Sequence, residues 1–96
     1  MSDITLNAIW IGSLTADVRE AHNMREALYK STLVKYQDYI SPVSYSDNGL
    51  VQFMIFPCGS KDDWQNKHFW EALVTTAARL CAGSKFTIKR LYVATF

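Results

Sequence analysis

The stretch that decides the fold reads Pro57-Cys58-Gly59-Ser60-Lys61-Asp62-Asp63-Trp64 and continues through Phe69-Trp70 to Cys81-Ala82-Gly83. Ser60 is a favourable N-cap residue, and Asp63 stands three positions later, as in a shortened capping box. Apolar residues then recur at helical spacing as far as Gly83, which suits the left-handed residue that ends a helix. The stretch therefore predicts a helix over residues 60–83, against which a small sheet packs.

The segment before this helix predicts two antiparallel strands. Residues 50–56 are apolar at almost every position, which is typical of a strand buried on both faces in the middle of a sheet. Residues 46–49, Ser-Asp-Asn-Gly, form a turn signal that joins it to the preceding segment. Residues 35–46 are rich in tyrosine and β-branched residues, but Pro42 indicates an edge strand or a break.

The N-terminal third predicts a strand followed by a helix. The even positions from Ile4 to Trp10 are apolar, which indicates a half-buried strand, and Ile9 and Ile11 occupy the opposite phase. An amphipathic stripe follows at Leu14, Val18, Ala21, Met24 and Leu28. We expect Thr15 or Ser13 to cap this second predicted helix.

The C-terminal segment predicts a last strand over residues 84–96, with Phe86 and Ile88 directed inward and Lys85, Thr87 and Lys89 outward. The alternation changes phase after Arg90, which predicts a bulge near residues 89–90. The order strand, helix, strand, strand, helix, strand predicts an α+β, ferredoxin-like βαββαβ sandwich with a four-stranded antiparallel sheet and two helices on one face.

Composition places the chain among globular proteins. Its 96 residues predict a single domain over residues 1–96, and 49% of them are hydrophobic. No apolar run is long enough for a membrane helix and no signal peptide is evident, so we expect a cytoplasmic protein without a membrane partner. The formal net charge of +1 neither favours nor excludes nucleic acid.

No residue pattern indicates a catalytic site, a metal site or a cofactor. Cys58, Cys81, His22 and His68 lack the paired spacing of zinc ligands. Cys58 precedes a predicted helix N-terminus, where its thiol could become reactive, but it more simply ends a buried strand. We expect Cys81 to lie in the core, and the adjacent carboxylates of Asp62 and Asp63 to serve the helix N-terminus rather than acid–base catalysis.

The chain has more apolar and tyrosine residues than one covered sheet face needs. An exposed apolar patch of this kind usually marks an interface, and tyrosine is enriched there. We therefore predict a non-enzymatic protein-interaction module that forms a homodimer through the open sheet face or binds another protein. The predicted interface residues are Tyr36, Tyr39, Tyr45, Trp64, Lys67, His68, Leu91, Tyr92 and Val93.

Two alternatives stay open. A single-stranded nucleic-acid binder would use Lys85, Lys89, Arg90 and Tyr92, because sheets of this type stack bases on aromatic residues among basic ones. A small dimeric enzyme of the ferredoxin-like monooxygenase type would have an apolar cavity between sheet and helices. That cavity would be lined by His22 or His68 together with Trp64 or Trp70.

The eight residues Pro57–Trp64, with their Gly-Ser-Lys-x-x-Trp step after an apolar strand that ends in proline, resemble small uncharacterised bacteriophage and prophage proteins. The resemblance implies a phage accessory protein that acts in the host cytoplasm. It further implies a binder of a host protein, including an inhibitor of a host defence protein. It assigns no catalytic residue.

Overall fold

The computed structural model describes residues 4–32, 34–55 and 67–95, and side chains within residues 8–32, 37–55 and 71–90. The elements in chain order are β1 (Ile4–Ser13), α1 (Val18–Ser31), the 3-10 helix η1 (Val34–Tyr39), β2 (Ser44–Tyr45), β3 (Val51–Ile55), α3 (Lys67–Cys81) and β4 (Thr87–Thr95).

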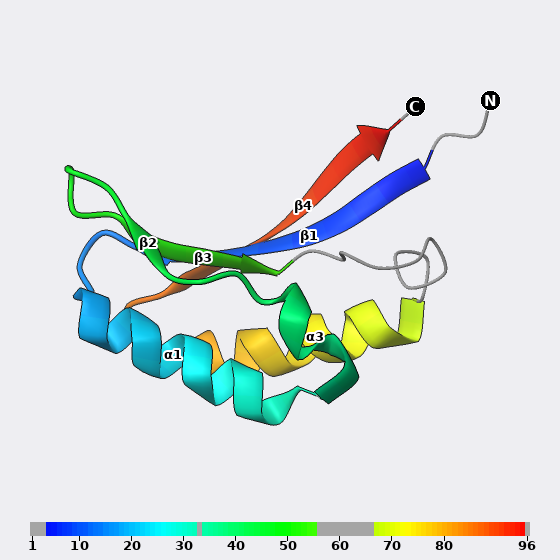
Figure 1. Cartoon of the computed structure of the whole chain (residues 1–96), viewed down its shortest axis with the longest axis horizontal. Helices are drawn as coiled ribbons and strands as arrows, with labels where there is room; N and C mark the ends of the chain where they lie inside the picture. The colour runs from blue at the N-terminus through cyan, green and yellow to red at the C-terminus, as the bar shows by residue number, and fades with distance from the viewer. Residues whose placement is uncertain (1–3, 33, 56–66, 96) are drawn as a thin grey trace.

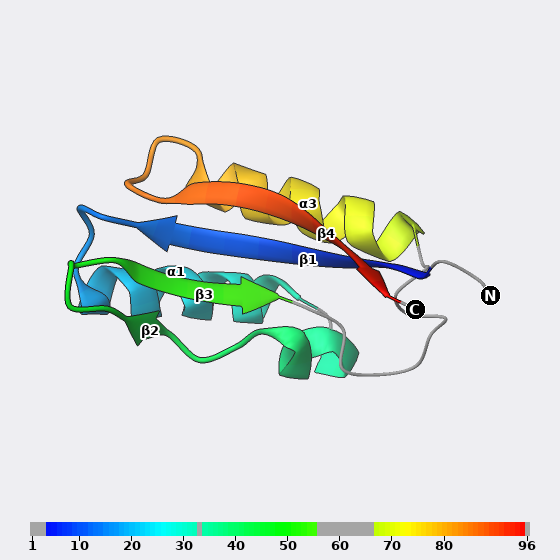
Figure 2. The ribbon, with the colours of Figure 1, turned by 90° about the horizontal axis from the view of Figure 1, so that it is seen from above.

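The four strands form one sheet in the order β2-β3-β1-β4, in which every neighbouring pair is antiparallel. Both α1 and α3 lie on the same side of this sheet (Figures 1 and 2). The predicted α+β class, the four-stranded antiparallel sheet and the two helices are therefore confirmed, as is the central position of β3. Buried residues from the sheet and both helices form one core cluster.

The core is built on the odd-numbered residues of β1 and β3. Ile9 pairs with Ile55 and Ile11 with Phe53, and all four side chains are buried. Directly opposed residues of an antiparallel pair share a face, so these four point toward the helices. Ile9 and Ile11, which occupy the phase opposite to the one predicted to be buried, thus lie in the core. Trp10, from the phase predicted to be buried, lies on the open face instead.

Two residues of β3 correct a second prediction. Val51, Phe53 and Ile55 are buried, whereas Gln52 and Met54 between them are half-buried. The strand therefore has one core face and one face directed away from the helices. A continuous apolar run predicted burial on both faces, but methionine and glutamine can border water on an uncovered face because their long side chains cover apolar surface.

Helix α1 begins at a different residue from the predicted one. Asp17 is its N-cap and forms a complete capping box with Glu20. The buried Ser13 hydroxyl instead accepts hydrogen bonds from the backbone N–H groups of Thr15 and Ala16, which shapes the loop before the helix. Leu14 also lies in this loop and is 67% exposed, so the buried stripe of α1 starts after it and includes Ala21 and Leu28.

The ambiguous segment 35–46 is mostly not a strand. It contains η1, an isolated bridge between Ile40 and Ile55, and the two-residue strand β2 after Pro42. The predicted turn at residues 46–49 is confirmed, because Gly49 adopts a φ of 88° and its N–H donates to the carbonyl oxygen of Ser46. A positive φ is readily accessible only to glycine, which explains the residue at this position.

Helix α3 ends as predicted, because Gly83 follows it with a φ of 74°. Its predicted start at Ser60, with Asp62 and Asp63, lies outside the described residues. In β4, Phe86 is buried just before the strand and Ile88 packs against the core, while Lys85, Thr87 and Lys89 are exposed, as predicted. The predicted bulge is wrong, because β4 pairs with β1 without interruption from Thr87 to Thr95.

Candidate functional site

The sheet face turned away from the helices has a tryptophan near its centre. Trp10 pairs with Met54 on one side and with Lys89 on the other. It is half-buried, and neither α1 nor α3 covers this face (Figure 1). The pairing register also places Gly12, Gln52 and Thr87 on the same face. We call these residues the Trp10 surface: Trp10, Gly12, Gln52, Met54, Thr87 and Lys89.

Trp10 is held in place from two directions. Its indole lies over Gly12, where a Cβ atom would fall 2.6 Å from Cη2 and 2.9 Å from Cε2 of the ring. Its Nε1–H donates a 2.6 Å hydrogen bond to Oε1 of Gln52 on the neighbouring strand. The missing side chain at Gly12 provides the room for the ring, and the amide fixes the direction of the indole N–H. The ring is therefore oriented before any partner arrives.

Lys89 adds a positive charge to this surface. Its Nζ lies 5.4 Å from the Trp10 ring centroid, within the range of a cation–π interaction. The Lys89 side chain is exposed. Among the described side chains of the Trp10 surface there is no carboxylate. The surface thus combines an aromatic ring, a thioether, an amide and one ammonium group, a mixture that suits binding more than acid–base chemistry.

The two predicted tyrosines whose side chains are described, Tyr39 and Tyr45, do not lie on this face. Tyr39 is 8% exposed and belongs to the core cluster. Tyr45 is 71% exposed but pairs with the buried Val51, which places it on the helix side of the edge strand β2. Burial of Tyr39 follows from the turn of η1 back onto the core, which the sequence did not indicate.

The other predicted interface residues are located only by their backbones or not at all. Tyr36 lies in η1, and Lys67 and His68 begin α3. Leu91, Tyr92 and Val93 pair with Ala8, Asn7 and Leu6 in the β1–β4 ladder. Trp64 lies outside the described residues. The predicted set is therefore distributed over several elements, of which only β4 contributes to the Trp10 surface.

The alternative nucleic-acid residues are also separated. Lys89 faces the Trp10 surface, whereas Arg90 pairs with the core residue Ile9, and its Nη1 donates to Oε1 of Glu71 at 3.2 Å. Lys85 lies before β4 and forms a 3.2 Å ion pair with Glu20. Adjacent residues of a strand point to opposite faces, so Lys89 and Arg90 cannot serve one flat surface.

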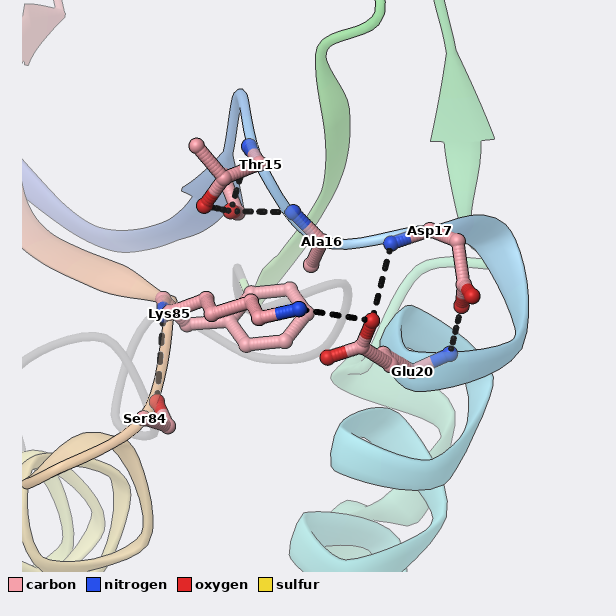
Figure 3. Close-up of polar contacts among 8 residues, drawn as sticks. Thr15, Ala16, Asp17, Glu20, Ser84 and Lys85 are labelled. Atoms are coloured by element: carbon pink, nitrogen blue, oxygen red, sulfur yellow. Dashed lines mark hydrogen bonds and ion pairs between the residues drawn. The ribbon is translucent and has the colours of Figure 1, made fainter.

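A second concave feature lies where α1 meets the turn between α3 and β4. It is an open groove of about 520 Å³ that includes Met24, Ala27, Leu80 and Phe86 in its lining. Figure 3 shows the polar end of this groove, where the Lys85 ammonium reaches the same Glu20 oxygen that accepts from the N–H of Asp17. This ion pair thus links the first turn of α1 to the segment between α3 and β4.

The residues considered for chemistry do not assemble a reactive centre in the described ranges. Cys81 is buried, and this burial raises the pKa of its thiol above the ordinary value, which disfavours the nucleophilic thiolate. His22 lies exposed on α1. Cys58 falls outside the described residues. Residues 4–32, 34–55 and 67–95 contain no cluster of histidine, cysteine and carboxylate ligands for a metal.

No helix in the described ranges is long and apolar enough to cross a bilayer. Comparison with protein-family models, with curated proteins and with solved structures finds no match. Support for the Trp10 surface as a binding site therefore comes from its geometry. Sequence reasoning missed it, although a glycine two residues after a strand tryptophan is a usable signal, because glycine in a strand often marks a close approach.

Proposed function

We propose that this protein is a non-enzymatic module that binds a protein partner through the Trp10 surface. The observation that carries the proposal is the Trp10 indole, which is oriented by Gly12 and Gln52 on the sheet face that neither helix covers. Tryptophan is among the residues that dominate binding energy at protein interfaces. A ring that is already oriented loses less conformational entropy when a partner covers it.

The surrounding residues support the same role. Met54 is a flexible apolar side chain that adapts to different contacts, and Gln52 and Thr87 provide polar groups beside it. Lys89 gives the surface a local positive charge, which favours a partner with acidic groups around an apolar patch. The partner that best matches this chemistry is a protein surface that is apolar at its centre and acidic at its rim.

The resemblance of Pro57–Trp64 to phage and prophage proteins supports a more specific version of the proposal. In that version the chain is a phage accessory protein in the host cytoplasm, and its partner is a host protein, with defence proteins as the first candidates. We also propose that the fold is of the ferredoxin-like type. Its support is that each α-helix connects strands separated by one intervening strand, as in a split βαβ arrangement.

A photocrosslinking experiment with two matched positions tests the binding surface. Thr87 and Thr75 are both exposed, but Thr87 belongs to the Trp10 surface and Thr75 lies on α3. A photoreactive amino acid at Thr87 should capture a discrete protein from a bacterial host lysate, and the same group at Thr75 should not. Trp10→Ala should abolish the adduct formed from position 87. Equal adducts from both positions, or an adduct that is unaffected by Trp10→Ala, would exclude this surface.

A second candidate function is single-stranded nucleic-acid binding, favoured by the position of Lys89 over the Trp10 ring. An aromatic ring with an adjacent ammonium group can stack a base and contact a phosphate. Fluorescence anisotropy with a labelled single-stranded oligonucleotide at low salt tests it. Trp10→Ala and Lys89→Ala should each weaken binding, whereas Lys85→Ala should have less effect because Lys85 pairs with Glu20. The absence of binding by wild-type protein at tens of micromolar would remove this candidate.

A further inference from the structure

The outer edge of β4 has no strand beside it in the described part of the chain. β4 ends the strand order, and all nine of its residues pair on one side with β1, from Thr87 opposite Gly12 to Thr95 opposite Ile4. In an antiparallel strand the backbone groups alternate between the two sides. The side of β4 away from β1 therefore presents a row of N–H and C=O groups that another strand can pair with.

The features that discourage edge pairing are restricted to the first half of β4. Lys89 and Arg90 place charge there, and lysine on an edge strand opposes association with another strand. Residues 91–95, Leu-Tyr-Val-Ala-Thr, contain no charge and no proline, and they continue the ladder without a bulge. Their composition is high in residues that favour strands. Within the described ranges, the second half of β4 thus has no feature that opposes edge pairing.

The same half of β4 lies where the described sheet is narrowest. β3 ends at Ile55, which pairs with Ile9, so among the described residues Ile4–Ala8 pair with β4 alone. Figure 1 shows this part of β1 and β4 rising away from α1 and α3 toward both chain termini. A ribbon of two strands is at most marginally stable in water and gains stability when further strands are added.

We propose that residues 91–95 of β4 pair antiparallel with the same residues of a second copy of this chain. Such a contact is isologous, so a two-fold axis between the copies satisfies it and closes the assembly as a dimer. The distribution of charge along β4 selects the position of this two-fold axis. A two-fold axis at Arg90 would oppose two arginines directly, whereas an axis at Val93 pairs uncharged residues and leaves Lys89 and Arg90 beyond the paired segment.

The dimer made in this way joins two four-stranded sheets edge to edge. Counting the described residues alone, the two-stranded part of each copy then lies within a four-stranded segment, and a sheet of four strands is more stable than a ribbon of two. The contact uses an edge, whereas the proposed partner site uses a sheet face. The two proposals are consequently independent, and separate variants affect them.

Analytical ultracentrifugation of three chains tests the dimer. Wild-type protein should sediment with twice the 11.0 kDa chain mass as its concentration rises from about 1 to about 100 µM, the range of weak to moderate dimers. Val93→Lys places an additional charge in the paired segment of each copy and should give a monomer over that range. Thr87→Lys, on the same strand outside the paired segment, should remain dimeric. Circular dichroism should be the same for all three.

A second variant, amide hydrogen exchange and Trp10→Ala complete the test of the dimer. If Val93→Lys changes the circular dichroism, Leu91→Lys serves as the second variant. Amide hydrogen exchange in wild-type protein should slow at residues 91–95 as concentration rises, without the same change at residues 51–55. Trp10→Ala should leave the dimer intact, which separates this contact from the proposed partner site. A wild-type monomer at about 100 µM, or a dimer that Trp10→Ala dissociates while Val93→Lys does not, would overturn the proposal.

Discussion

The indole N–H of Trp10 donates a 2.6 Å hydrogen bond to the side-chain oxygen of Gln52, which lies 42 residues further along the chain. The bond crosses from β1 to β3 on the sheet face turned away from both helices. It links the orientation of the ring to the pairing of the two central strands. Three further features, Gly12, the α1 cap and Cys81, likewise lead to measurable consequences.

Gly12→Ala should destabilise the protein, because the new Cβ would overlap the Trp10 ring. Adding a methyl group to a packed site costs about 1–3 kcal/mol, measurable as the free energy of unfolding in urea. The matched control is the same change in a Trp10→Ala background, where the ring is absent. There the substitution should be neutral or slightly stabilising, since alanine restricts the unfolded chain more than glycine. Equal destabilisation in both backgrounds would contradict the ring-over-glycine arrangement.

Gln52→Met should remove the acceptor for the Trp10 N–H while conserving most of the side-chain volume. Loss of one hydrogen bond costs about 0.5–1.5 kcal/mol of the free energy of unfolding. In a Trp10→Phe background, which lacks the donor, the same substitution should cost measurably less. The difference between the two costs is the coupling energy of the pair, obtained from a double-mutant cycle in urea. A coupling energy of zero would show that the hydrogen bond does not stabilise the protein.

Asp17→Ala should destabilise α1, because Asp17 is the N-cap and accepts a 2.7 Å hydrogen bond from the N–H of Glu20. Loss of such a cap costs about 0.5–2 kcal/mol in the free energy of unfolding. Thr15→Ala is the comparison, since Thr15 was one of the two caps expected from the sequence, with Ser13, but lies in the loop before the helix. A larger loss from Thr15→Ala than from Asp17→Ala would indicate that the helix starts earlier.

The stability of the fold should decrease at alkaline pH because of Cys81. Burial raises the pKa of this thiol from its ordinary value of 9.0, so the folded state holds the proton more tightly than the unfolded state does. This contribution to stability is complete below the ordinary pKa and is lost as the pH rises from that value through the higher pKa of the folded state. Urea unfolding at a series of alkaline pH values measures the decline.

The control for this pH dependence compares two chains. The Cys58→Ser variant retains Cys81 as its single thiol, and the Cys58→Ser, Cys81→Ala variant has none. The decrease of the free energy of unfolding at alkaline pH should be smaller in the variant without Cys81 than in the Cys58→Ser variant. The thiol of Cys81 should also react slowly with a disulfide reagent in the native protein and rapidly in urea, since burial limits both access and thiolate formation. Rapid labelling without denaturant would show that Cys81 is more accessible than the structure indicates.

Local signals predicted much of the architecture. The turn at residues 46–49 and the helix end at Gly83 depend on glycine at a positive φ, a requirement that a single residue satisfies. The stripe of α1 and the alternation at the start of the last strand are similarly local. The cap of α1 was misplaced because Ser13, Thr15 and Asp17 are all good N-cap residues. Only the path of the loop decides which one meets the helix.

The candidate site was less predictable, because it depends on contacts between distant residues. Tyr39 and Tyr45 are tyrosines of the same segment, yet Tyr39 at the end of η1 is buried and Tyr45 in β2 is exposed at the sheet edge. Lys89 and Arg90 are adjacent basic residues but belong to opposite faces of β4. Residue type suggested that the protein has an interface. The strand pleat and the path of η1 determined which residues could lie on the same surface.

The sequence by itself determined the α+β class, the turn and helix-end positions and the inward phase of Phe86 and Ile88. It did not determine which face of β1 lies in the core, since both phases of that strand carry large apolar residues. Tertiary structure decided this through β3, whose Phe53 and Ile55 lie opposite Ile11 and Ile9 and are buried with them beneath the helices. Burying that set together leaves Trp10 on the other face, where Gly12 provides room for its ring.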